Sequence, residues 1–347
     1  MALPKVTIQI VSYNSLRYLK GCFDSLLNQT YRDFQIIVID NDSQDGTVDF
    51  IKKNYHHITV IRNSKNAGFA KANNQGIKIF HSPYVLLCNP DITLEPDWLE
   101  KMMEIAESEK YKETSSFCGK LLKMKIVNVE TTETEKTDTI DSCGLKILKS
   151  HQVVELGAGK SVKEFNSDRE VFGCSGALVL YRREALEQVM LKGKGIESGE
   201  YFDEDIFFYK EDVDLAWRLR LAGWQAHMIP GAIAYHVRAL AGAEGLKVSQ
   251  VIKNRRKQHK MGRYYSYRNH LLMLIKNQFR SNFFKYFFPI IGFELRKIGY
   301  LLIFEWSTLR AWGGVIKLWP QMRRKRKLIF QKTRISAVDM QKWIGRN

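Results

Sequence analysis

Short apolar runs alternate with stretches of helical spacing over the first 95 residues of the chain. Buried strands are predicted where β-branched and other apolar residues run together, at residues 6–11, 34–39, 59–61 and 84–88. Helices are predicted between them, at residues 16–27 and 70–80. This alternation is typical of an α/β fold, in which helices cover a parallel sheet.

Polar side chains cluster just past three of the predicted strands, at residues 12–14, 40–42 and 89–91. In an open α/β sheet, ligands bind outside the carboxyl ends of the strands, so we expect these segments to line one crevice. Asn89 and Asp91 are two residues apart, and in an extended chain such a pair points the same way. Both side chains can then reach one Mg²⁺ or Mn²⁺ ion, which would neutralise a diphosphate leaving group.

Each of these segments also has a simpler interpretation. The sequence IDNDSQDGT at residues 39–47 places carboxylates and amides where they suit the donor groups of a nucleobase and a ribose. An Asx-rich turn that caps the next helix has the same composition. The sequence NPD at residues 89–91 is likewise a common turn. Alone, neither segment decides between a ligand site and a turn.

Acidic residues are concentrated in one aromatic stretch of the second half. Six of them fall within twelve positions: Asp203, Glu204, Asp205, Glu211, Asp212 and Asp214. The apolar spacing after Asp212 predicts an amphipathic helix that begins there, where the helix dipole favours a carboxylate. For Asp203 and Asp214 we expect helix capping or a solvated face, whereas Glu211 and Asp212 are candidates for chemistry.

The end of the chain has a different composition. Residues 247–347 hold 24 Lys and Arg against 3 Asp and Glu, which leaves 30 against 34 for the rest, so the net charge of +17 belongs to this tail. The apolar stretch at residues 283–306 is interrupted by Lys285, Glu294 and Arg296 before it reaches the roughly 18 to 20 residues of a spanning helix. We therefore predict that it lies at an anionic membrane surface, with further attraction from RRKRK at residues 323–327.

The tail also has other interpretations, and the overall composition excludes some classes of protein. The tail can instead form a helical core with a solvated basic rim, or a homo-oligomer contact, and we see no nucleic-acid-binding motif. Apolar residues at 45% and charged residues at 26% exclude wholesale disorder and a polytopic membrane protein. Five cysteines without metal or disulfide spacing favour a reducing cytoplasm, and we expect no secretory signal in the first residues.

Six segments, in order along the chain, resemble the inverting nucleotide-sugar glycosyltransferases of family 2. They are VSYN at 11–14, IDNDSQDGT at 39–47, NAGFAKANNQGI at 66–77, LLCNPDI at 86–92, GCSGALVLYRREAL at 173–186 and FDEDIFFYKEDVDLAWR at 202–218. The resemblance implies a catalytic domain of GT-A fold, with a Rossmann-like, mostly parallel sheet flanked by helices, over residues 1–245. Residues 246–347 would then form a helical, basic, membrane-associating extension.

Three phrases are most similar to the rhamnosyltransferase branch of this family. They are NAGFAKANNQGI, IDSCGLKI at 140–147 and RNHLLMLIKN at 268–277. This branch implies transfer of L-rhamnose from dTDP-L-rhamnose to a polysaccharide or lipid-linked saccharide, as in O-antigen or cell-wall synthesis, at the cytoplasmic face of the inner membrane. A UDP-sugar donor is one alternative, and a non-catalytic nucleotide-sugar-binding subunit of a polysaccharide assembly complex is another.

The resemblance also implies roles for individual residues. Asp212 would be the general base that takes the proton of the acceptor hydroxyl, with Glu211 as a supporting or alternative base. The implied contacts to the nucleotide-sugar are Ser12, Tyr13, Asn14, Asp40, Asn41, Asn66, Gly68, Asn89 and Asp91. The implied floor of the acceptor and donor-sugar site is Gly173, Cys174, Ser175 and Gly176. The divalent cation, Mg²⁺ or Mn²⁺, would be held by Asp91 and His236, although Asn89 stands where the family commonly has a carboxylate, and His236 would also suit a core.

Overall fold

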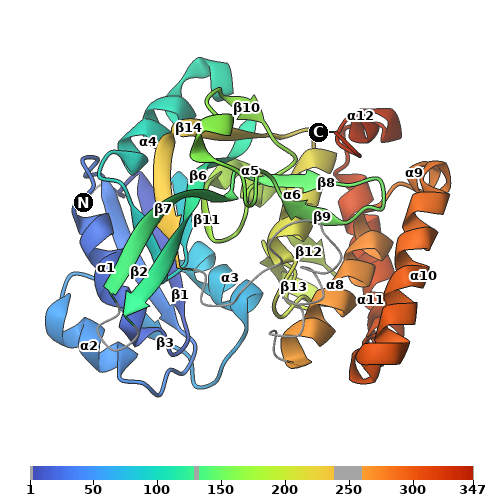
Figure 1. The fold of residues 1–347 in the computed structure, drawn as a ribbon, viewed down its shortest axis with the longest axis horizontal. Helices are drawn as coiled ribbons and strands as arrows, with labels where there is room; N and C mark the ends of the chain where they lie inside the picture. Colours follow the sequence, from blue (N-terminus) through green and yellow to red (C-terminus); the bar gives the residue numbers. More distant parts are fainter. Residues whose placement is uncertain (1–2, 129–132, 238–259, 347) are drawn as a thin grey trace.

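A mixed sheet forms the centre of the molecule (Figure 1). The computed structural model describes residues 3–128, 133–237 and 260–346. Within these residues the sheet has ten strands: β1 (Val6–Ser12), β2 (Phe34–Asp40), β3 (Thr59–Arg62), β4 (Tyr84–Cys88), β5 (Ile92–Leu94), β6 (Thr114–Asn128), β7 (Glu133–Ser142), β10 (Arg169–Glu170), β11 (Leu178–Arg182) and β14 (Gln225–His236). Their order is β10-β14-β6-β11-β4-β1-β2-β3, with β5 paired to β14 and β7 to β6.

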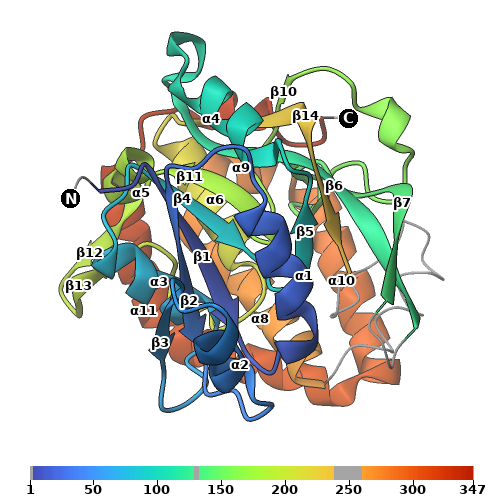
Figure 2. The same ribbon diagram turned by 90° about the vertical axis from the view of Figure 1, so that its left-hand side faces the viewer.

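The half of the sheet that holds β3, β2, β1 and β4 is parallel. The helices around it and beside the neighbouring strands are α1 (Leu16–Leu27), α2 (Thr47–Asn54), α3 (Phe69–Ile79), α4 (Trp98–Glu107) and the 3-10 turn η1 (Glu109–Tyr111). Helices α1 and α4 pack with the buried side chains of β1 on one face, and α1 is turned towards the viewer in Figure 2. The predicted strands and helices of the first 95 residues are confirmed, each boundary within one residue.

The other half of the sheet is mixed. Strand β11 runs antiparallel to both β4 and β6, whereas β14 runs parallel to β6. The smaller elements are β8 (Leu145–Ile147) paired with β9 (Val153–Glu155), β12 (Leu191–Gly193) paired with β13 (Ile196–Glu200), the 3-10 turn η2 (Val162–Glu164), and the helices α5 (Arg183–Val189) and α6 (Glu211–Leu221). Helices α3, α5 and α6 share a second apolar cluster with the opposite face of the sheet. All five cysteines are buried and free.

Helices make up the end of the chain, as predicted. They are α8 (Lys260–Asn277), α9 (Arg280–Lys285), α10 (Phe287–Phe304), η3 (Trp306–Arg310), α11 (Ala311–Gln331) and α12 (Ala337–Gln341). They stack beside α6 at the right of Figure 1. Met273 of α8 and Ile329 of α11 join Trp217 of α6 in one apolar cluster. The domain boundary predicted after residue 245 lies outside the described residues, and it stays a prediction.

Helix α6 is buried along its whole length except at Asp212. The prediction of an amphipathic helix is therefore wrong, because other parts of the chain cover its polar side. Arg218 donates to Asp214 over 3.0 Å within the helix, and Arg220 donates to the carbonyl oxygen of Phe172 over 2.9 Å. Each buried charge thus has a partner, as burial of an ion requires.

The basic run at residues 323–327 faces two ways. Arg323, Arg324 and Lys327 are exposed, whereas Lys325 is completely buried and pairs with carboxylates. The expectation that the whole run faces a membrane is therefore wrong for Lys325. Among the described residues, no helix combines the length and the apolar composition needed to cross a bilayer.

Candidate active site

The carboxyl ends of β1, β2 and β4 meet at one edge of the sheet, because β2 and β4 both run parallel to β1. We call residues 12–14, 40–43 and 89–91 the strand-end loops. The backbone N–H of Asn41 donates to the carbonyl oxygen of Ser12 over 2.8 Å, and that of Asn14 donates to Ser43 Oγ over 2.9 Å. The first two loops are therefore fastened to each other, as the crevice predicted from the sequence requires.

Asp40 offers an acceptor at this edge. Its side chain is completely buried, and Oδ2 accepts a hydrogen bond of 2.9 Å from the backbone N–H of Ser43. Its Oδ1, like Ser12 Oγ, has no hydrogen-bond partner within the part of the chain that the structure describes. A buried carboxylate oxygen without a partner is costly, so a ligand N–H at this point would be stabilising.

Other residues predicted to contact the nucleotide form hydrogen bonds with the backbone at this edge of the sheet. Asn41 donates to the carbonyl oxygen of Gly68 over 3.3 Å, and Asn66 Oδ1 accepts from the backbone N–H of Gly68 over 2.9 Å. Asn14 has a left-handed φ of 51° and accepts from Gln44, whereas the Tyr13 side chain is exposed. These side chains lie at the predicted edge, and their contacts to a ligand stay a prediction.

Gly68 is the point at which this edge touches the acidic stretch. Its φ of 83° lies in the left-handed region, and a Cβ there would stand 2.5 Å from the Phe207 ring. The backbone N–H of the next residue, Phe69, donates to the carbonyl oxygen of Phe207 over 3.1 Å. Both the backbone conformation and the close approach require glycine at this position.

The structure brings Asp91 and His236 together, as the resemblance implies. His236 ends β14 and is paired in register with Ile92 of β5, which follows directly after Asp91. Its Nε2 lies 3.3 Å from Asp91 Oδ1 and its Nδ1 lies 2.9 Å from Asp141 Oδ2. Burial alone lowers the pKa of His236, but hydrogen bonds to Asp141 and Asp91 outweigh it and raise the pKa to about 9.

This pair suits a cation that arrives with a phosphorylated ligand. Within the described residues no group of three or more His, Cys, Asp or Glu side chains forms a closed metal cage. Mg²⁺ commonly binds one or two protein ligands and takes the rest from substrate phosphates and water. Asp141 contacts the other ring nitrogen of His236, where it would orient the ligating histidine after the loss of its proton.

Asp212 lies at the second residue of α6, next to the predicted floor. Its Oδ2 accepts a hydrogen bond of 3.0 Å from the backbone N–H of Gly176, and its Oδ1 accepts one of 2.7 Å from Val213. The neighbouring carbonyl oxygen, that of Ala177, accepts from the backbone N–H of Asn89 over 2.8 Å. Residues 176 and 177 thus join the Asp212 carboxylate directly to the strand-end loop at 89–91.

Glycines allow this close approach of α6 to the floor. A Cβ on Gly173 would stand 2.3 Å from Ala216 Cβ, and one on Gly176 would stand 3.1 Å from Asp212 Cβ. Cys174 is buried between them, and Ser175 Oγ donates to Glu155 Oε1 over 3.1 Å. The predicted floor, residues 173–176, is therefore in contact with the candidate base.

Glu211 differs from its neighbour Asp212 in exposure and in hydrogen bonding. Its side chain is buried, and its Oε2 has no hydrogen-bond partner within the described residues. Burial, together with the nearby Asp212 carboxylate, raises the pKa of Glu211 to about 8. A carboxyl group that keeps its proton at neutral pH cannot accept another one, so Asp212 remains the candidate for the base.

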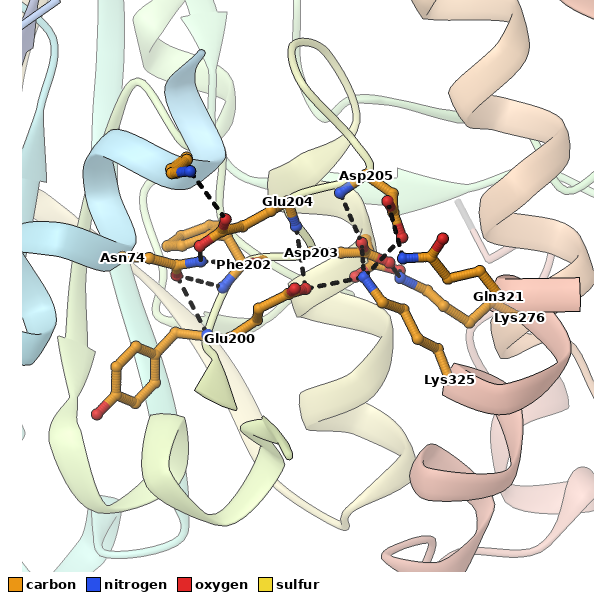
Figure 3. A network of polar contacts seen from close by, with 12 residues as sticks. Asn74, Glu200, Phe202, Asp203, Glu204, Asp205, Lys276, Gln321 and Lys325 are labelled. Carbon is orange, nitrogen blue, oxygen red and sulfur yellow. Dashed lines mark hydrogen bonds and ion pairs between the residues drawn. The ribbon is translucent and has the colours of Figure 1, made fainter. Parts of the chain in front are cut away.

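The other acidic residues of this stretch, which we call the acidic segment (residues 201–214), have a role that the sequence did not indicate. Asp203 and Asp214 are completely buried, so the predicted solvated role is wrong for both, and the N-cap of α6 is Lys210, so neither of them caps that helix. Asp203 pairs with Lys276 and Lys325 (Figure 3). Lys276 Nζ also lies 2.7 Å from Asp214 Oδ1. The local sequence could not indicate this role, because the partner lysines lie far along the chain.

The model of the family described as glycosyl transferase family 2 matches residues 7–190, which is more than half of the chain. The chain belongs to this family. A glycosyltransferase of Haemophilus influenzae is 33% identical over 107 residues, 30% of this chain and 33% of the relative. Chondroitin synthase of Escherichia coli is 31% identical over 104 residues, 29% of this chain and 15% of the relative. The matched part is thus a third or less of these curated relatives.

A longer match is found with N-acetylglucosaminyl-diphospho-decaprenol L-rhamnosyltransferase of Mycobacterium tuberculosis. It is 26% identical over 242 residues, 66% of this chain and 75% of the relative. Among solved structures, S. aureus TarS 1–349 superposes with a TM-score of 0.52 at 15% identity, over 97% of this chain and 91% of TarS. A mannosyltransferase of Pyrobaculum calidifontis with GDP-Man and Mn²⁺ superposes with a TM-score of 0.50 at 14% identity, over 96% and 86%. These likenesses confirm a GT-A-like fold.

Proposed function

We propose that this family 2 member transfers a sugar from a nucleotide-sugar to an acceptor hydroxyl, with inversion at the anomeric carbon. The observation that carries this proposal is the short link from the Asp212 carboxylate through residues 176 and 177 to the strand-end loop at 89–91. It places a partly exposed carboxylate next to the edge at which ligands of α/β sheets bind.

In the proposed reaction Asp212 accepts the proton of the acceptor hydroxyl as that oxygen attacks the anomeric carbon. The new C–O bond forms on the face opposite the nucleotide, while the bond from the anomeric carbon to the diphosphate oxygen breaks. A single displacement of this kind inverts the configuration. A divalent cation held by Asp91 and His236 would supply the charge that neutralises the departing diphosphate.

The donor that we propose is dTDP-L-rhamnose. The relative from M. tuberculosis, named as an L-rhamnosyltransferase with a decaprenol-linked substrate, supports both the sugar and a lipid-linked saccharide acceptor. The unpartnered Oδ1 of Asp40 suits the ring N–H that thymine and uracil share. A UDP-sugar donor is therefore the nearest alternative.

Incubation of the purified chain with a panel of nucleotide sugars tests this proposal. Release of nucleoside diphosphate should be fastest with dTDP-L-rhamnose in the presence of a polyprenyl-linked saccharide, and a chelator should slow it. Faster turnover of a UDP-sugar would overturn the donor assignment alone. Binding of every nucleotide without turnover of any would support the non-catalytic subunit instead.

We also propose that the C-terminal helices hold the protein at the cytoplasmic face of the inner membrane. Phe288, Leu295 and Leu302 recur every seven residues along one side of α10, with exposures of 85%, 63% and 49%. Trp312 and Trp319 stand on the exposed side of α11. Aromatic and aliphatic side chains on such a helix face enter the headgroup region of a bilayer.

The charges around this surface suit anionic lipid. The exposed basic residues of the described span 260–331 are Lys260, Arg280, Lys285, Arg296, Arg310, Lys317, Arg323, Arg324 and Lys327. The two acidic residues of the described span 260–331, Glu294 and Glu305, are not exposed. The surface is therefore positive as well as apolar, which favours an anionic leaflet over a second copy of this chain.

Flotation with vesicles tests this location. The triple substitution Phe288→Ser, Leu295→Ser and Leu302→Ser should abolish flotation with vesicles that contain phosphatidylglycerol. As a matched control, Ile79→Ser changes a side chain of 53% exposure on α3, away from this surface, and should float like the wild type. Equal flotation of both variants would refute the membrane role, and a dimer that only the triple variant loses would replace it with self-association.

A further inference from the structure

The acidic segment, which ends with the candidate base, is held from two opposite sides (Figure 3). On one side Asn74 of α3 accepts hydrogen bonds from the backbone N–H groups of Tyr201 and Phe202, over 3.1 Å and 2.8 Å. Its amide donates back to the carbonyl oxygen of Phe202 over 2.8 Å. On the other side, the C-terminal helices contribute two lysines and several hydrogen bonds.

Two lysines of those helices enter the segment as buried cations. Lys325 Nζ of α11 lies 2.8 Å from both Glu200 Oε2 and Asp205 Oδ2, and it also pairs with Asp203. Lys276 of α8 bridges Asp203 and Asp214, and its neighbour Asn277 donates to Asp214 over 2.7 Å. The side chains of Asp203, Lys276 and Lys325 are completely buried.

Such pairs add little net stability. The desolvation of buried charges offsets most of their attraction, and apolar residues of similar size often stabilise a fold as well or better. What a buried ionic network supplies is a defined arrangement of the groups that it joins, because each charge must keep its partner. The network therefore restricts the conformation of the acidic segment more than it stabilises the fold.

The backbone just before Asp212 is strained, and α8 holds it. Tyr209 and Lys210 both adopt left-handed conformations, with φ of 67° and 73°. For residues other than glycine this conformation is unfavourable. Asn269 of α8 donates 2.8 Å hydrogen bonds to the carbonyl oxygens of Phe208 and Tyr209, and Arg268 donates to that of Asp205 over 2.6 Å. These bonds fix the turn from which α6 begins.

We propose that Asn269, Lys276 and Lys325 are positioning residues that set the orientation of the Asp212 carboxylate. The inference rests on the proposed function of Asp212 as the base. In this arrangement the C-terminal helices complete the site, because they hold the turn at residues 209–210 and the carboxylates on either side of it. Two of the three residues, Asn269 and Lys276, belong to RNHLLMLIKN at 268–277. The sequence alone indicates no role for the residues of this segment.

Asn269→Leu is the decisive variant, because it removes two hydrogen bonds to the strained turn and changes none of the ion pairs of the network. It also removes the oxygen that accepts from Arg268 Nε over 2.9 Å, whereas the bond from Arg268 to the carbonyl oxygen of Asp205 is kept. Asn282→Leu is its matched control. Asn282 is also a buried asparagine of the C-terminal helices, but it donates to the carbonyl oxygen of Ala337, outside the acidic segment. Each protein is assayed for kcat, for the affinity of UDP and dTDP, and for amide hydrogen exchange.

We expect Asn269→Leu to lower kcat by about 10- to 100-fold, because a base displaced by about 1 Å loses turnover on that scale. The affinity of UDP and dTDP should stay within about twofold of the wild type, and exchange should accelerate in residues 201–214 while the strands keep their protection. Asn282→Leu should keep both kcat and exchange of that segment. A second variant, Asp203→Asn with Lys325→Met, removes one charge of each sign and should give the same pattern.

The proposal is overturned if Asn269→Leu turns over as fast as Asn282→Leu, or if exchange rises equally across the whole molecule. The second outcome would show a general loss of stability instead of a displaced segment. Exchange also separates this proposal from the proposed function. If the wild type transfers no sugar, the function fails, while faster exchange confined to residues 201–214 still supports the positioning role.

Discussion

The strand-end loops and the acidic segment are two halves of one candidate site that are held in place in different ways. The first two loops are fastened to each other, Asn41 to Ser12 and Asn14 to Ser43, within the first 43 residues of the chain. The acidic segment depends on lysines 73 and 122 residues away from Asp203. Nucleotide binding and base positioning should therefore respond to different substitutions.

The substitution with the largest expected effect is Asp212→Asn, which removes the base but keeps the shape of the side chain. General base catalysis contributes typically about 10²- to 10⁴-fold, so kcat should fall by that factor. The affinity of UDP and dTDP should change by less than about twofold. Asp49→Asn, at an exposed carboxylate in the first turn of α2, should keep wild-type turnover. Near-wild-type turnover by Asp212→Asn would contradict the proposal that Asp212 is the base.

An intermediate effect is expected for Gly68→Ala, at the contact between the two halves. The left-handed φ and the Phe207 ring 2.5 Å from the new Cβ should displace the loop, which we expect to weaken UDP and dTDP binding about tenfold. Gly195→Ala is the matched control, because Gly195 has a similar φ of 82° but no atom within 4 Å of the Cβ. If titration calorimetry gives both variants the wild-type affinity, the loop at residues 66–68 does not shape the nucleotide site.

The smallest effect is expected for Glu211→Gln, and it should appear in the pH dependence of the stability of the fold instead of in turnover. Because burial and Asp212 raise its pKa to about 8, folding binds a proton between roughly pH 4.5 and pH 8. The wild type should lose stability as the pH rises through this window, by up to about 1.4 kcal/mol per pH unit from this group. Glu211→Gln should not show that loss. The melting temperature of the variant should therefore rise relative to that of the wild type between pH 5 and pH 8.

Glu184→Gln gives the control for this pH dependence. Glu184 lies in the first turn of α5 and is exposed, so its substitution should leave the pH profile of the melting temperature parallel to that of the wild type. If Glu211→Gln is also parallel to the wild type, Glu211 is ionised in the folded state. It would then be a competitor of Asp212 for the role of base.

The first half of the fold could be predicted from the sequence because its signals are local. Runs such as residues 34–39 are buried on both faces of a parallel sheet, and the helices between them keep their apolar spacing. The parallel order then places residues 12–14, 40–42 and 89–91 at one edge without further information. The association of Asp91 with His236 came instead from the resemblance, and the contact of Asp212 with Gly176 came from the structure.

The rest could not be predicted because its causes are distant in the chain. Asp203 and Asp214 have the sequence context of helix caps, and only the folded arrangement brings Lys276 to both. Lys325 stands in a run of five basic residues that is typical of a solvated surface. Within a helix, however, one member of such a run can point inward while its neighbours point outward.

The distance in sequence between Asp203 and its lysines also bears on how the protein is made. A ribosome completes the sheet and α6 well before it reaches Lys276, and Lys325 follows about fifty codons later, at about 5–20 residues per second. Until Lys276 has been made, the Asp203 carboxylate has neither lysine to neutralise it, and until Lys325 has been made it has only one of the two. A chain that terminates in α11 before residue 325 would therefore lack one of the two cations that pair with Asp203, and we expect it to lose turnover as the variants of the ionic network do.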